Sequence, residues 1–512
     1  AQLHIHGHSP HWPHLYPHAH TTALPTYPFQ HHRFWLTPHT TARTSGDATG
    51  EDLLWKAIDE QAIDTVRQML ALSDDQTGAL PPVIQALSRW RKDRQTRGIV
   101  DSLRYRIGWQ PIVVNDLSPT RQRWLVIASP SQTENNAWIT GLSQHYGSDI
   151  DIMVVDPNDH NKKSLTNLLS TTATHAHCDG IVSFLAWDER PHPDYCGIPQ
   201  GLISTLLIGQ AYANSSLNIP LWITTQGGVE ISTQAGPASV TQAAVWGLGQ
   251  SLCLEHPERF GGLIDLAPQP TPEQLQQLHT VLSCPQQEDQ LAIGPHGINA
   301  RRLYPAPLPP QLPPTWTPSG TALITGATGR LGKHIAHWLA RAGASHLILL
   351  SRNATHNPEA TQLQQELHAS GITTTLASID VTDRAALAAF LTQTRHQHGP
   401  IQTVVHAAAT ITDHPISEVT TAQFSIDYSK AIAADNLAQL LHDDPPETFI
   451  LFSSAAATWG GAHQGCYAAA NAHLDALAYH LRAHTPTQAL SIAWGLWADH
   501  HPTHQTPTAT LA

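Results

Sequence analysis

Side chains that could reduce a carbonyl group are concentrated in the last third of this 512-residue chain. Ser454 follows a strand-like run, and Tyr467 lies thirteen residues beyond it. Lys430 lies upstream, on a helix expected over about 421–441. Hydride addition leaves negative charge on the carbonyl oxygen, so a proton donor must lie beside that oxygen. We expect Tyr467 to be the donor, with Lys430 lowering its pKa from about 10 towards neutrality, and Ser454 to hydrogen-bond the same oxygen.

Asn471 completes this group of polar residues. It comes four residues after Tyr467, one helical turn along and on the same helix face. From there it could hold a backbone carbonyl or a water molecule of a proton relay. Any one of these residues could equally be a buried core residue with satisfied hydrogen bonds. Their combination behind a nucleotide-binding turn favours a reductase.

That turn follows the strand-like run TALIT at 321–325 and leads into a helix. In its GxxGxxG pattern the first glycine permits a tight turn, the second lets a pyrophosphate approach the backbone, and the third lets helix and strand pack closely. The positive end of the helix dipole then faces the phosphates. The predicted cofactor contacts here are Gly326, Thr328, Gly329, Arg330, Leu331 and Gly332.

The end of the next strand indicates which cofactor is bound. An NAD site usually has an acidic residue there for the ribose diol, whereas this chain has Ser351 and Arg352. The pair favours the 2′-phosphate of NADPH, although Arg352 could also be an ordinary surface arginine. Asp380, just after the third strand, could bind the adenine amine, or it could be a turn or helix-capping residue before Thr382.

Alternating strand-like and helical runs surround these motifs. The strand-like runs lie at 124–128, 151–155, 180–186 and 221–225, and then at 321–325, 346–350, 373–379, 403–407, 448–453 and 489–494. This alternation predicts an α/β fold with two Rossmann-like, doubly wound parallel-sheet subdomains, one structural and one catalytic. Apolar residues at helical spacing predict a short helical pair before them, at 51–72 and about 82–91, whose apolar faces need a partner.

Composition argues against several other classes of protein. With 41% apolar and 13% charged residues the chain is globular. A formal net charge of −13 without a basic stripe argues against nucleic acid as a partner, and no apolar run is long enough to span a membrane. Five cysteines without a CxxC pair fit a cytoplasmic protein with no disulfide framework. The histidine-rich N-terminus is interrupted by prolines, so we expect a composition bias and no metal site.

Several motifs together resemble the short-chain dehydrogenase family, and within it the ketoreductases of modular type I polyketide synthases. They are TGATGRLG (325–332), HAAA (406–409), Lys430, the segment 452–478 and SIAWGLWAD (491–499). Most short-chain dehydrogenases have lysine four residues after the tyrosine, whereas these ketoreductases have asparagine there and take lysine from an earlier helix, as this chain does. The resemblance implies that NADPH reduces a β-ketoacyl thioester on the phosphopantetheine of an acyl carrier protein. It also implies cofactor contacts at Val381, Ala407 and Ala408.

The resemblance implies a division of the chain as well. Residues 1–45, with LPTYPFQHHRFWL at 24–36, resemble the linker that follows an acyltransferase, and 46–98 resemble a dimerisation element, so a homodimer through 51–94 is expected. Residues 99–304 resemble a structural subdomain; its first turn, 128–134, has no glycine for a pyrophosphate. A proline-rich linker at 305–320 precedes the catalytic subdomain at 321–512. Because the chain begins at Ala1 and ends in DHHPTHQTPTATLA, we expect an excised piece that lacks the final strand and an intact lid.

Two fingerprints of these ketoreductases concern the configuration of the product. The position of an expected Leu-Asp-Asp triplet is occupied by residues 411–413 (Ile-Thr-Asp), and Trp459 stands eight residues before Tyr467. Both features resemble the A group, which yields the L-β-hydroxyl. Gln464, three residues before Tyr467, replaces the histidine that marks acceptance of an epimerised α-carbon. Trp459 and Gln464 are therefore the expected substrate-orienting residues, although Trp459 could simply pack under a lid.

Two other functions remain to be weighed against an active reductase. A catalytically silent segment that dimerises the module would fit the helical pair and the short C-terminus, but not the intact set of polar residues. A stand-alone sugar or steroid dehydrogenase would leave the segment at 24–36 unexplained.

Overall fold

The computed structural model describes residues 50–72, 80–114, 122–156, 162–231, 239–283, 288–309 and 316–497. The histidine-rich N-terminus, the linker segment at 24–36 and the C-terminal run at 499–512 lie outside these residues. The chain divides into two compact units, residues 1–98 and 99–512. Within the described ranges, no helix combines the length and the apolar character needed to cross a membrane.

The N-terminal unit contains three described helices instead of the predicted pair: α3 (Gly50–Asp59), α4 (Ile63–Met69) and α6 (Leu80–Leu103). The prediction of one helix over 51–72 is wrong because the backbone turns at Gln61, whose φ is +54°. The prediction of a helix over 82–91 is too short. The polar run that follows Arg91 is rich in Arg, Lys and Gln, which favour helix, and α6 continues through it and past residue 98.

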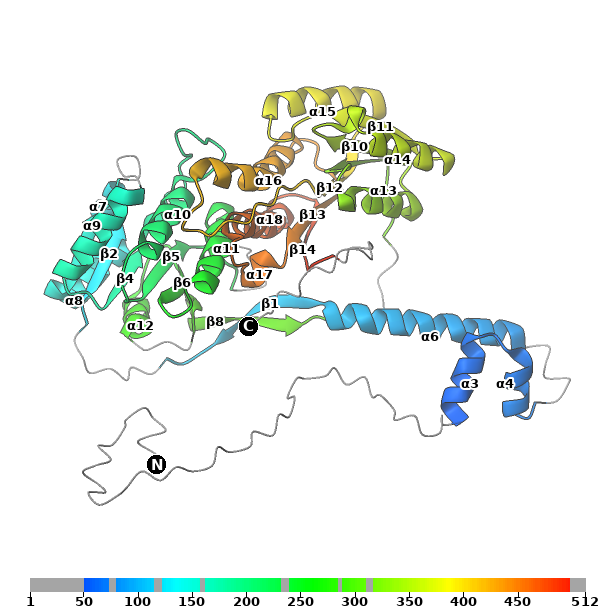
Figure 1. Cartoon of the computed structure of the whole chain (residues 1–512), viewed down its shortest axis with the longest axis horizontal. Helices are drawn as coiled ribbons and strands as arrows, with labels where there is room; N and C mark the ends of the chain where they lie inside the picture. Colours follow the sequence, from blue (N-terminus) through cyan, green and yellow to red (C-terminus); the bar gives the residue numbers. More distant parts are fainter. Residues whose placement is uncertain are drawn as a thin grey trace, which may run out of the picture. The chain divides into compact units, whose positions relative to one another are not determined.

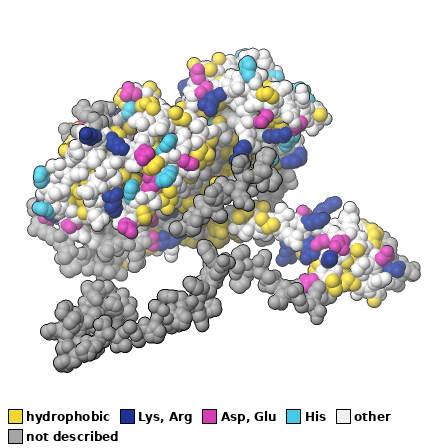
Figure 2. Space-filling view, in the orientation of Figure 1, with side chains coloured by type: hydrophobic (Ala, Val, Ile, Leu, Met, Phe, Trp, Pro, Cys, Tyr) yellow, Lys and Arg dark blue, Asp and Glu magenta, His cyan; other side chains and the backbone are white. Residues whose placement is uncertain are grey.

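The α3, α4 and α6 helices enclose a small apolar cluster, which consists of Ala57, Ile58, Val66, Leu80 and Ile84. Arg91 on α6 forms an ion pair with Asp59 on α3, with 2.8 Å between Nη1 and Oδ2. Leu53 and Val83 are large apolar residues of the same helices that stay about half exposed. Apolar and charged side chains thus lie beside one another on this part of the surface (Figure 2).

The first subdomain, residues 99–305, is built on an eight-stranded sheet with the order β1-β8-β7-β6-β5-β4-β2-β3. Its strands are β1 (Tyr105–Pro111), β2 (Trp124–Ala128), β3 (Ile150–Val154), β4 (Gly180–Ser183), β5 (Leu221–Gln226), β6 (Phe260–Leu266), β7 (Gln290–Gly294) and β8 (Gly297–Pro305). Its described α-helices are α7 (Pro130–Asn135), α8 (Ala137–Tyr146), α9 (Lys162–His175), α10 (Gln200–Ala213), α11 (Val240–Glu255) and α12 (Pro272–Ser283).

The prediction of a wholly parallel sheet is wrong for one strand of this subdomain. Strands β2 to β7 pair in parallel, whereas β8 is antiparallel to both β7 and β1. Only two residues separate β7 from β8, and Gly297 begins β8 with φ of +108°. A connection of two residues can join antiparallel strands only, because a parallel crossover needs a dozen residues or more.

The second subdomain contains six parallel strands in the order β11-β10-β9-β12-β13-β14. They are β9 (Thr321–Thr325), β10 (His346–Ser351), β11 (Thr373–Ser378), β12 (Ile401–His406), β13 (Thr448–Ser454) and β14 (Gln488–Trp494). The helices between and after them are α13 (Arg330–Ala342), α14 (Pro358–Ala369), α15 (Arg384–His398), α16 (Thr421–Leu440), α17 (Ala456–Trp459) and α18 (Gly465–His484). All six predicted strands of this subdomain are confirmed to within two residues.

This strand order is that of the doubly wound dinucleotide-binding fold, counted 3-2-1-4-5-6 along the chain. The order reverses between β9 and β12, and ligands of such sheets bind beyond the C-terminal ends of the strands at this switch point. Among the described residues β14 is the edge strand, and Leu490 on it is about half exposed.

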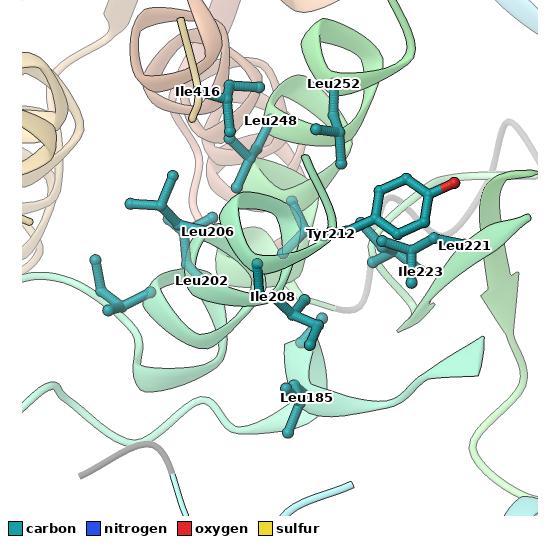
Figure 3. Close-up of a cluster of buried hydrophobic side chains, with 14 of the residues drawn as sticks. Leu185, Leu202, Leu206, Ile208, Tyr212, Leu221, Ile223, Leu248, Leu252 and Ile416 are labelled. Atoms are coloured by element: carbon teal, nitrogen blue, oxygen red, sulfur yellow. The ribbon is translucent and has the colours of Figure 1, made fainter. Parts of the chain in front are cut away.

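The two subdomains share one core. Helix α11 of the first packs along α18 of the second, and α17 lies against both (Figure 1). One cluster of buried side chains contains Leu248 and Leu252 from α11 together with Ile416 and Cys466 from the second subdomain. Figure 3 shows Ile416 beside Leu248 in this cluster. The first subdomain therefore forms part of the scaffold that holds α18.

Candidate active site

The glycine turn at the end of β9 is shaped as the sequence predicts. Gly326 has a φ of +71°, and a side chain there would place its Cβ 2.7 Å from the amide nitrogen of Ala408. At Gly332 an added Cβ would lie 2.1 Å from the carbonyl oxygen of Ala327. Only glycine fits these two positions, because any Cβ would collide with backbone atoms. The turn is therefore a shallow cradle of main-chain atoms at the switch point.

Helix α13 begins at this cradle without a side-chain cap. Gly329 is its N-cap residue, no side chain hydrogen-bonds the first amides, and the first turn contains no acidic residue. Thr328, Arg330 and Leu331 flank this helix end. The first amides of a helix point outward and carry the positive end of its dipole, so an uncapped start suits a phosphate.

The corresponding turn of the first subdomain is filled by its own side chains. Ser129 caps α7, and the side chain of Gln132 returns to the amide of Ser129, with 2.9 Å between nitrogen and oxygen. The amide group of Gln132 also donates to the carbonyl of Phe184, beyond β4. With these groups already paired, the turn offers nothing to a pyrophosphate.

The end of β10 has an unused polar group. The Ser351 hydroxyl is buried and has no hydrogen-bond partner among the residues that the structure describes, while Arg352 beside it is exposed. Burying a hydroxyl without a partner costs about 1–3 kcal/mol, so such a group is expected to meet a ligand. A hydroxyl and a guanidinium at the end of the second strand fit the ribose 2′-phosphate of NADPH.

Asp380 and Val381 have structural partners of their own. A carboxylate oxygen of Asp380 accepts from both the amide and the hydroxyl of Thr382, at 2.9 and 2.7 Å. This turn contact is the alternative that the sequence left open for Asp380. Val381 is buried, and its carbonyl accepts from the side-chain amide of Asn436 at 3.1 Å. Neither contact occupies the amide N–H of Val381.

A buried histidine connects the cofactor turn to the helix of Lys430. His406 ends β12; its Nδ1 lies 2.7 Å from the hydroxyl of Thr325, and its Nε2 lies 3.0 Å from the carbonyl oxygen of Lys430. The Thr325 hydroxyl oxygen in turn accepts from the amides of Ala407 and Ala408. Burial, and then the positive charge of Lys430, lower the pKa of His406 to about 3, so the ring is neutral. It therefore fixes β9, β12 and α16 relative to one another without adding charge.

Lys430, Asn471 and Tyr467 come together beyond β13. The Lys430 ammonium donates to the Asn471 side-chain oxygen at 2.8 Å and to the carbonyl of Phe452 at 2.5 Å. The side-chain nitrogen of Asn471 (Nδ2) donates to the main-chain carbonyl of Tyr467 at 2.7 Å. Lys430 Nζ also lies 5.4 Å from the centroid of the Tyr467 ring. The structure thus places the expected proton donor, the cation and the relay asparagine in one connected group.

The charge of Lys430 is balanced between two opposing effects. Burial lowers its pKa from 10.5 to about 7, and the carboxylate of Asp475 raises it. Asp475 lies on α18, one turn beyond Asn471. The sequence motifs do not indicate this acidic residue, because nothing local distinguishes it from a solvent-facing aspartate.

Ser454 lies at the end of β13 next to this group. Its hydroxyl oxygen accepts from the amide of Ala456 at 3.2 Å, and its neighbour Ser453 donates to the carbonyl of Asn471 at 3.2 Å. Ser454 and Tyr467 are both partly exposed, unlike Lys430 and Asn471, which are buried. The two groups proposed to contact a substrate oxygen are therefore those that solvent also reaches.

The two expected substrate-orienting residues differ in their contacts. Trp459 ends α17 with 57% of its surface exposed. Gln464 is held in place: its side-chain amide donates to the carboxylate of Asp413 at 3.0 Å. The two fingerprint segments are therefore hydrogen-bonded to each other. His463, which lies between Trp459 and Gln464 in the sequence, has φ of +66°, and its carbonyl accepts a hydrogen bond from the amide of His414.

The first subdomain holds these segments through residues that the sequence did not reveal. The carboxylate of Glu255, at the end of α11, accepts from the amide of Ile416 at 2.9 Å and from that of His463 at 3.0 Å. Arg301 on β8 donates to the carbonyl of Thr458 at 2.8 Å. These contacts fix the backbone of α17 at Thr458, the loop before Tyr467 at His463, and the segment before α16 at Ile416.

Comparison with protein families matches both subdomains. The family model described as "KR domain" matches residues 320–499. The model described as "Polyketide synthase extender module SpnB, Rossmann fold domain" matches residues 204–303. The two matches fall on the second and the first subdomain respectively.

Individual proteins are similar over most of the chain. "Polyketide synthase GfsA" of Streptomyces halstedii is 37% identical over 97% of this chain, which spans only 7% of the length of that protein. A solved "Structure of A-type Ketoreductases from Modular Polyketide Synthase" is 36% identical with a TM-score of 0.73, covering 78% of this chain and 84% of that one. "The Structure of a C2-type Ketoreductase from a Modular Polyketide Synthase" is also 36% identical, with a TM-score of 0.69, covering 78% and 86%.

Proposed function

Since the chain belongs to the ketoreductases of modular polyketide synthases, we propose that it uses NADPH to reduce a carrier-bound β-ketoacyl thioester. Family membership makes the chain a nicotinamide-dependent oxidoreductase that acts on a keto group. The observation that carries the finer proposal is the connected group of Lys430, Asn471 and Tyr467 beside β13. Strand β13 is the neighbour of β12 in a doubly wound sheet whose switch point lies between β9 and β12.

The cofactor would be held by the second subdomain alone. The backbone cradle from Gly326 to Gly332 and the start of α13 would bind its pyrophosphate, and Ser351 with Arg352 would bind the 2′-phosphate. Asp380, Val381, Ala407 and Ala408 would border the adenine and nicotinamide ends. When bound, NADPH supplies the hydride that reduces the carbonyl carbon.

The protein supplies the proton. The Tyr467 hydroxyl would donate it to the carbonyl oxygen as charge develops there, and the Ser454 hydroxyl would hydrogen-bond the same oxygen. The Lys430 ammonium, 5.4 Å from the ring centroid, favours the phenolate left on Tyr467. Asn471 orients this ammonium through its side-chain oxygen. Lys430 thereby stabilises the transition state without contacting the substrate.

The substrate is proposed from the class of protein and from the rim of the site. The relatives are components of multidomain polyketide synthases, so other domains of such a synthase would surround this chain, and an acyl carrier protein would present the thioester on its phosphopantetheine. Trp459 and Gln464 lie on either side of the loop that leads into α18. The resemblance of residues 411–413 and Trp459 to the A group implies the L-β-hydroxyl product, which we propose here. The exposed indole of Trp459 would form one wall for the thioester arm.

We also propose that residues 51–94 associate with a second copy of themselves. Leu53 and Val83 are exposed apolar residues of α3 and α6, and a two-fold interface would bury them. The apolar cluster inside these helices is small, so a second copy would add to their stability.

The decisive experiment gives the chain NADPH and a β-ketoacyl chain on a carrier protein, and resolves the product by chiral chromatography. We expect the L-β-hydroxyacyl product. Tyr467→Phe should retain NADPH binding and lose at least about 10²-fold in turnover, the usual contribution of a positioned acid. Tyr105→Phe, at an exposed tyrosine on β1 of the first subdomain, is the matched control. A D-hydroxyl product would overturn the configuration, and no NADPH oxidation by the unaltered chain would leave a silent, dimerising segment as the function.

A further inference from the structure

Asp475 is an ionisable residue beside the site that the proposed mechanism does not use. It follows Tyr467 and Asn471 at intervals of four residues on α18, so the three side chains share one face of the helix. This face points at the end of β13, where the carbonyl of Phe452 and the side chain of Asn471 hold Lys430. The presence of a carboxylate on this face must be explained, because burying an acidic side chain without a partner lowers the stability of the fold.

Two strands hold the Asp475 carboxylate in place. The hydroxyl of Ser491 on β14 donates to its Oδ1 at 2.5 Å. The hydroxyl of Ser453 on β13 donates to the main-chain carbonyl of Asn471 at 3.2 Å and also lowers the pKa of the Asp475 carboxyl. Asp475 therefore lies next to the residues that hold Asn471, whose side chain contacts Lys430.

Two cations, one from each subdomain, act on this carboxylate through their charge. Lys430 on α16 and Arg301 on β8 both lower the pKa of Asp475. Surrounding protein raises the pKa of Asp475 to about 6, although part of the residue reaches the surface, and the hydrogen bonds and the two cations oppose this rise. The other titratable groups that face this cluster are Tyr467 and Tyr479 on α18, His406 on β12 and, on the far side of Arg301, Asp289.

Lys430 needs such a counter-charge. Its two hydrogen-bond acceptors, the Phe452 carbonyl and the Asn471 amide oxygen, are neutral, and burial favours the uncharged amine. His406, its other ionisable neighbour, is itself uncharged. Asp475 is the group that favours the ammonium.

We propose that Asp475 is a positioning residue for the reduction, which serves as the counter-charge of Lys430 from the same face of α18 that carries Asn471. This inference rests on the proposed function.

The sign of the effect follows from the two groups. Lys430 is an ammonium below its pKa of about 7 and an amine above it. Without the carboxylate this pKa falls further, so the ammonium is lost at lower pH, and the basic limb of the turnover profile moves to lower pH. Removal of one nearby opposite charge shifts a pKa by about one unit or more.

The ionisation of Lys430 can be measured apart from activity. The chain has six lysines, so ¹³C-lysine labelling gives few NMR signals, and Lys430→Met assigns the one that matters. In Asp475→Asn the Lys430 titration and the basic limb of NADPH oxidation should both move down by about one pH unit. Asp475→Glu, which retains the carboxylate, should restore most of both. Asp435→Asn is the control, because Asp435 on α16 pairs with His473 and does not act on Lys430.

Ser491→Ala covers the case in which Asp475→Asn does not fold. It removes the 2.5 Å hydrogen bond but leaves the carboxylate, so it should move the Lys430 titration in the same direction by a smaller amount. A Lys430 titration that is the same in unaltered chain, Asp475→Asn and Ser491→Ala would overturn the inference, whether or not the chain reduces its substrate. A shifted titration in a chain that never oxidises NADPH would overturn the proposed function instead.

Discussion

Replacing Gly247 with alanine tests whether the first subdomain positions the proposed proton donor. Gly247 lies on α11 where it crosses α18, and a Cβ there would stand 2.2 Å from the carbonyl oxygen of Ala468 and 2.7 Å from the amide nitrogen of Ala469. An ordinary contact needs about 3.5 Å, so the two helices must separate by roughly 1 Å. Ala468 directly follows Tyr467, and the displacement therefore acts on the tyrosine.

The expected losses of stability and of turnover both follow from the close contact between α11 and α18. Overpacking a buried contact costs about 1–3 kcal/mol, although removal of a helix glycine returns up to about 1 kcal/mol. A displacement of about 1 Å in a catalytic group can reduce turnover by about 10²-fold. We therefore expect Gly247→Ala to lower the midpoint of urea unfolding and to reduce NADPH oxidation far more than the loss of folded protein explains.

Gly209 provides the matched control. It is also a buried helix glycine, on α10, and an added Cβ would meet only Leu252 at 3.4 Å, an ordinary contact. Gly209→Ala should leave both stability and turnover unchanged or slightly improved. If Gly247→Ala has the unfolding midpoint and the turnover of Gly209→Ala, the contact between α11 and α18 does not position Tyr467, and the argument fails.

Three further predictions concern the cofactor, the product and the N-terminal helices. Arg352→Ala should weaken the binding of NADPH by about 10–100-fold, which corresponds to the loss of one charge-assisted contact, and should weaken the binding of NADH much less. Arg341→Ala is the control in the cofactor titration, and equal losses of affinity for the two cofactors would refute a 2′-phosphate contact. Glu255→Gln leaves the backbone amide of either Ile416 or His463 without an acceptor, so chiral chromatography should find more of the minor hydroxyl product. If its product ratio equals that of the control Glu258→Gln, at an exposed position, Glu255 does not help to set the configuration. Leu53→Glu should convert dimer to monomer in sedimentation without loss of helix signal, and an unchanged dimer would place the interface elsewhere.

The second subdomain could be predicted almost completely from its sequence because its determinants are local. The glycine turn, the strand before it and the helix after it occupy one short stretch, and Ser454, Tyr467 and Asn471 lie within eighteen residues of one another. Strands β9, β10 and β13 are mainly apolar or β-branched runs, as expected for strands buried on both faces. The fold class follows from these patterns.

The first subdomain could be predicted less completely, because its last strands lack such runs. Strand β6 contains Gly261 and Gly262, and an added Cβ at Gly262 would lie 2.2 Å from the carbonyl oxygen of Asp289. These glycines reflect close backbone packing, which no periodicity expresses. Strand β8 is buried only at residues 298–300, is partly or fully exposed from Arg301 onward, and contains two arginines, so its second half resembles a surface loop in sequence.

The supporting residues of the site escaped prediction for a different reason. Glu255 holds a backbone amide 161 positions away in the sequence, and Arg301 holds a carbonyl 157 positions away. Their partners are main-chain atoms, which any sequence supplies, so no residue pattern marks the contact. Asp475 lies among helical alanines and leucines, and only the fold shows that its face of α18 points to Lys430 and not to solvent.

The single core formed by α11 and α18 has a consequence for recombination between synthases. The proline-rich stretch at 305–320 looks like a natural boundary for exchanging a reductase, yet Leu248 and Leu252 before it are buried with Ile416 and Cys466 after it. A hybrid joined at that stretch would pair each half with a foreign surface, and even one methyl group at Gly247 would collide with the partner helix. We therefore expect hybrids that inherit residues 99–497 from one parent to be more stable than hybrids joined at 305–320.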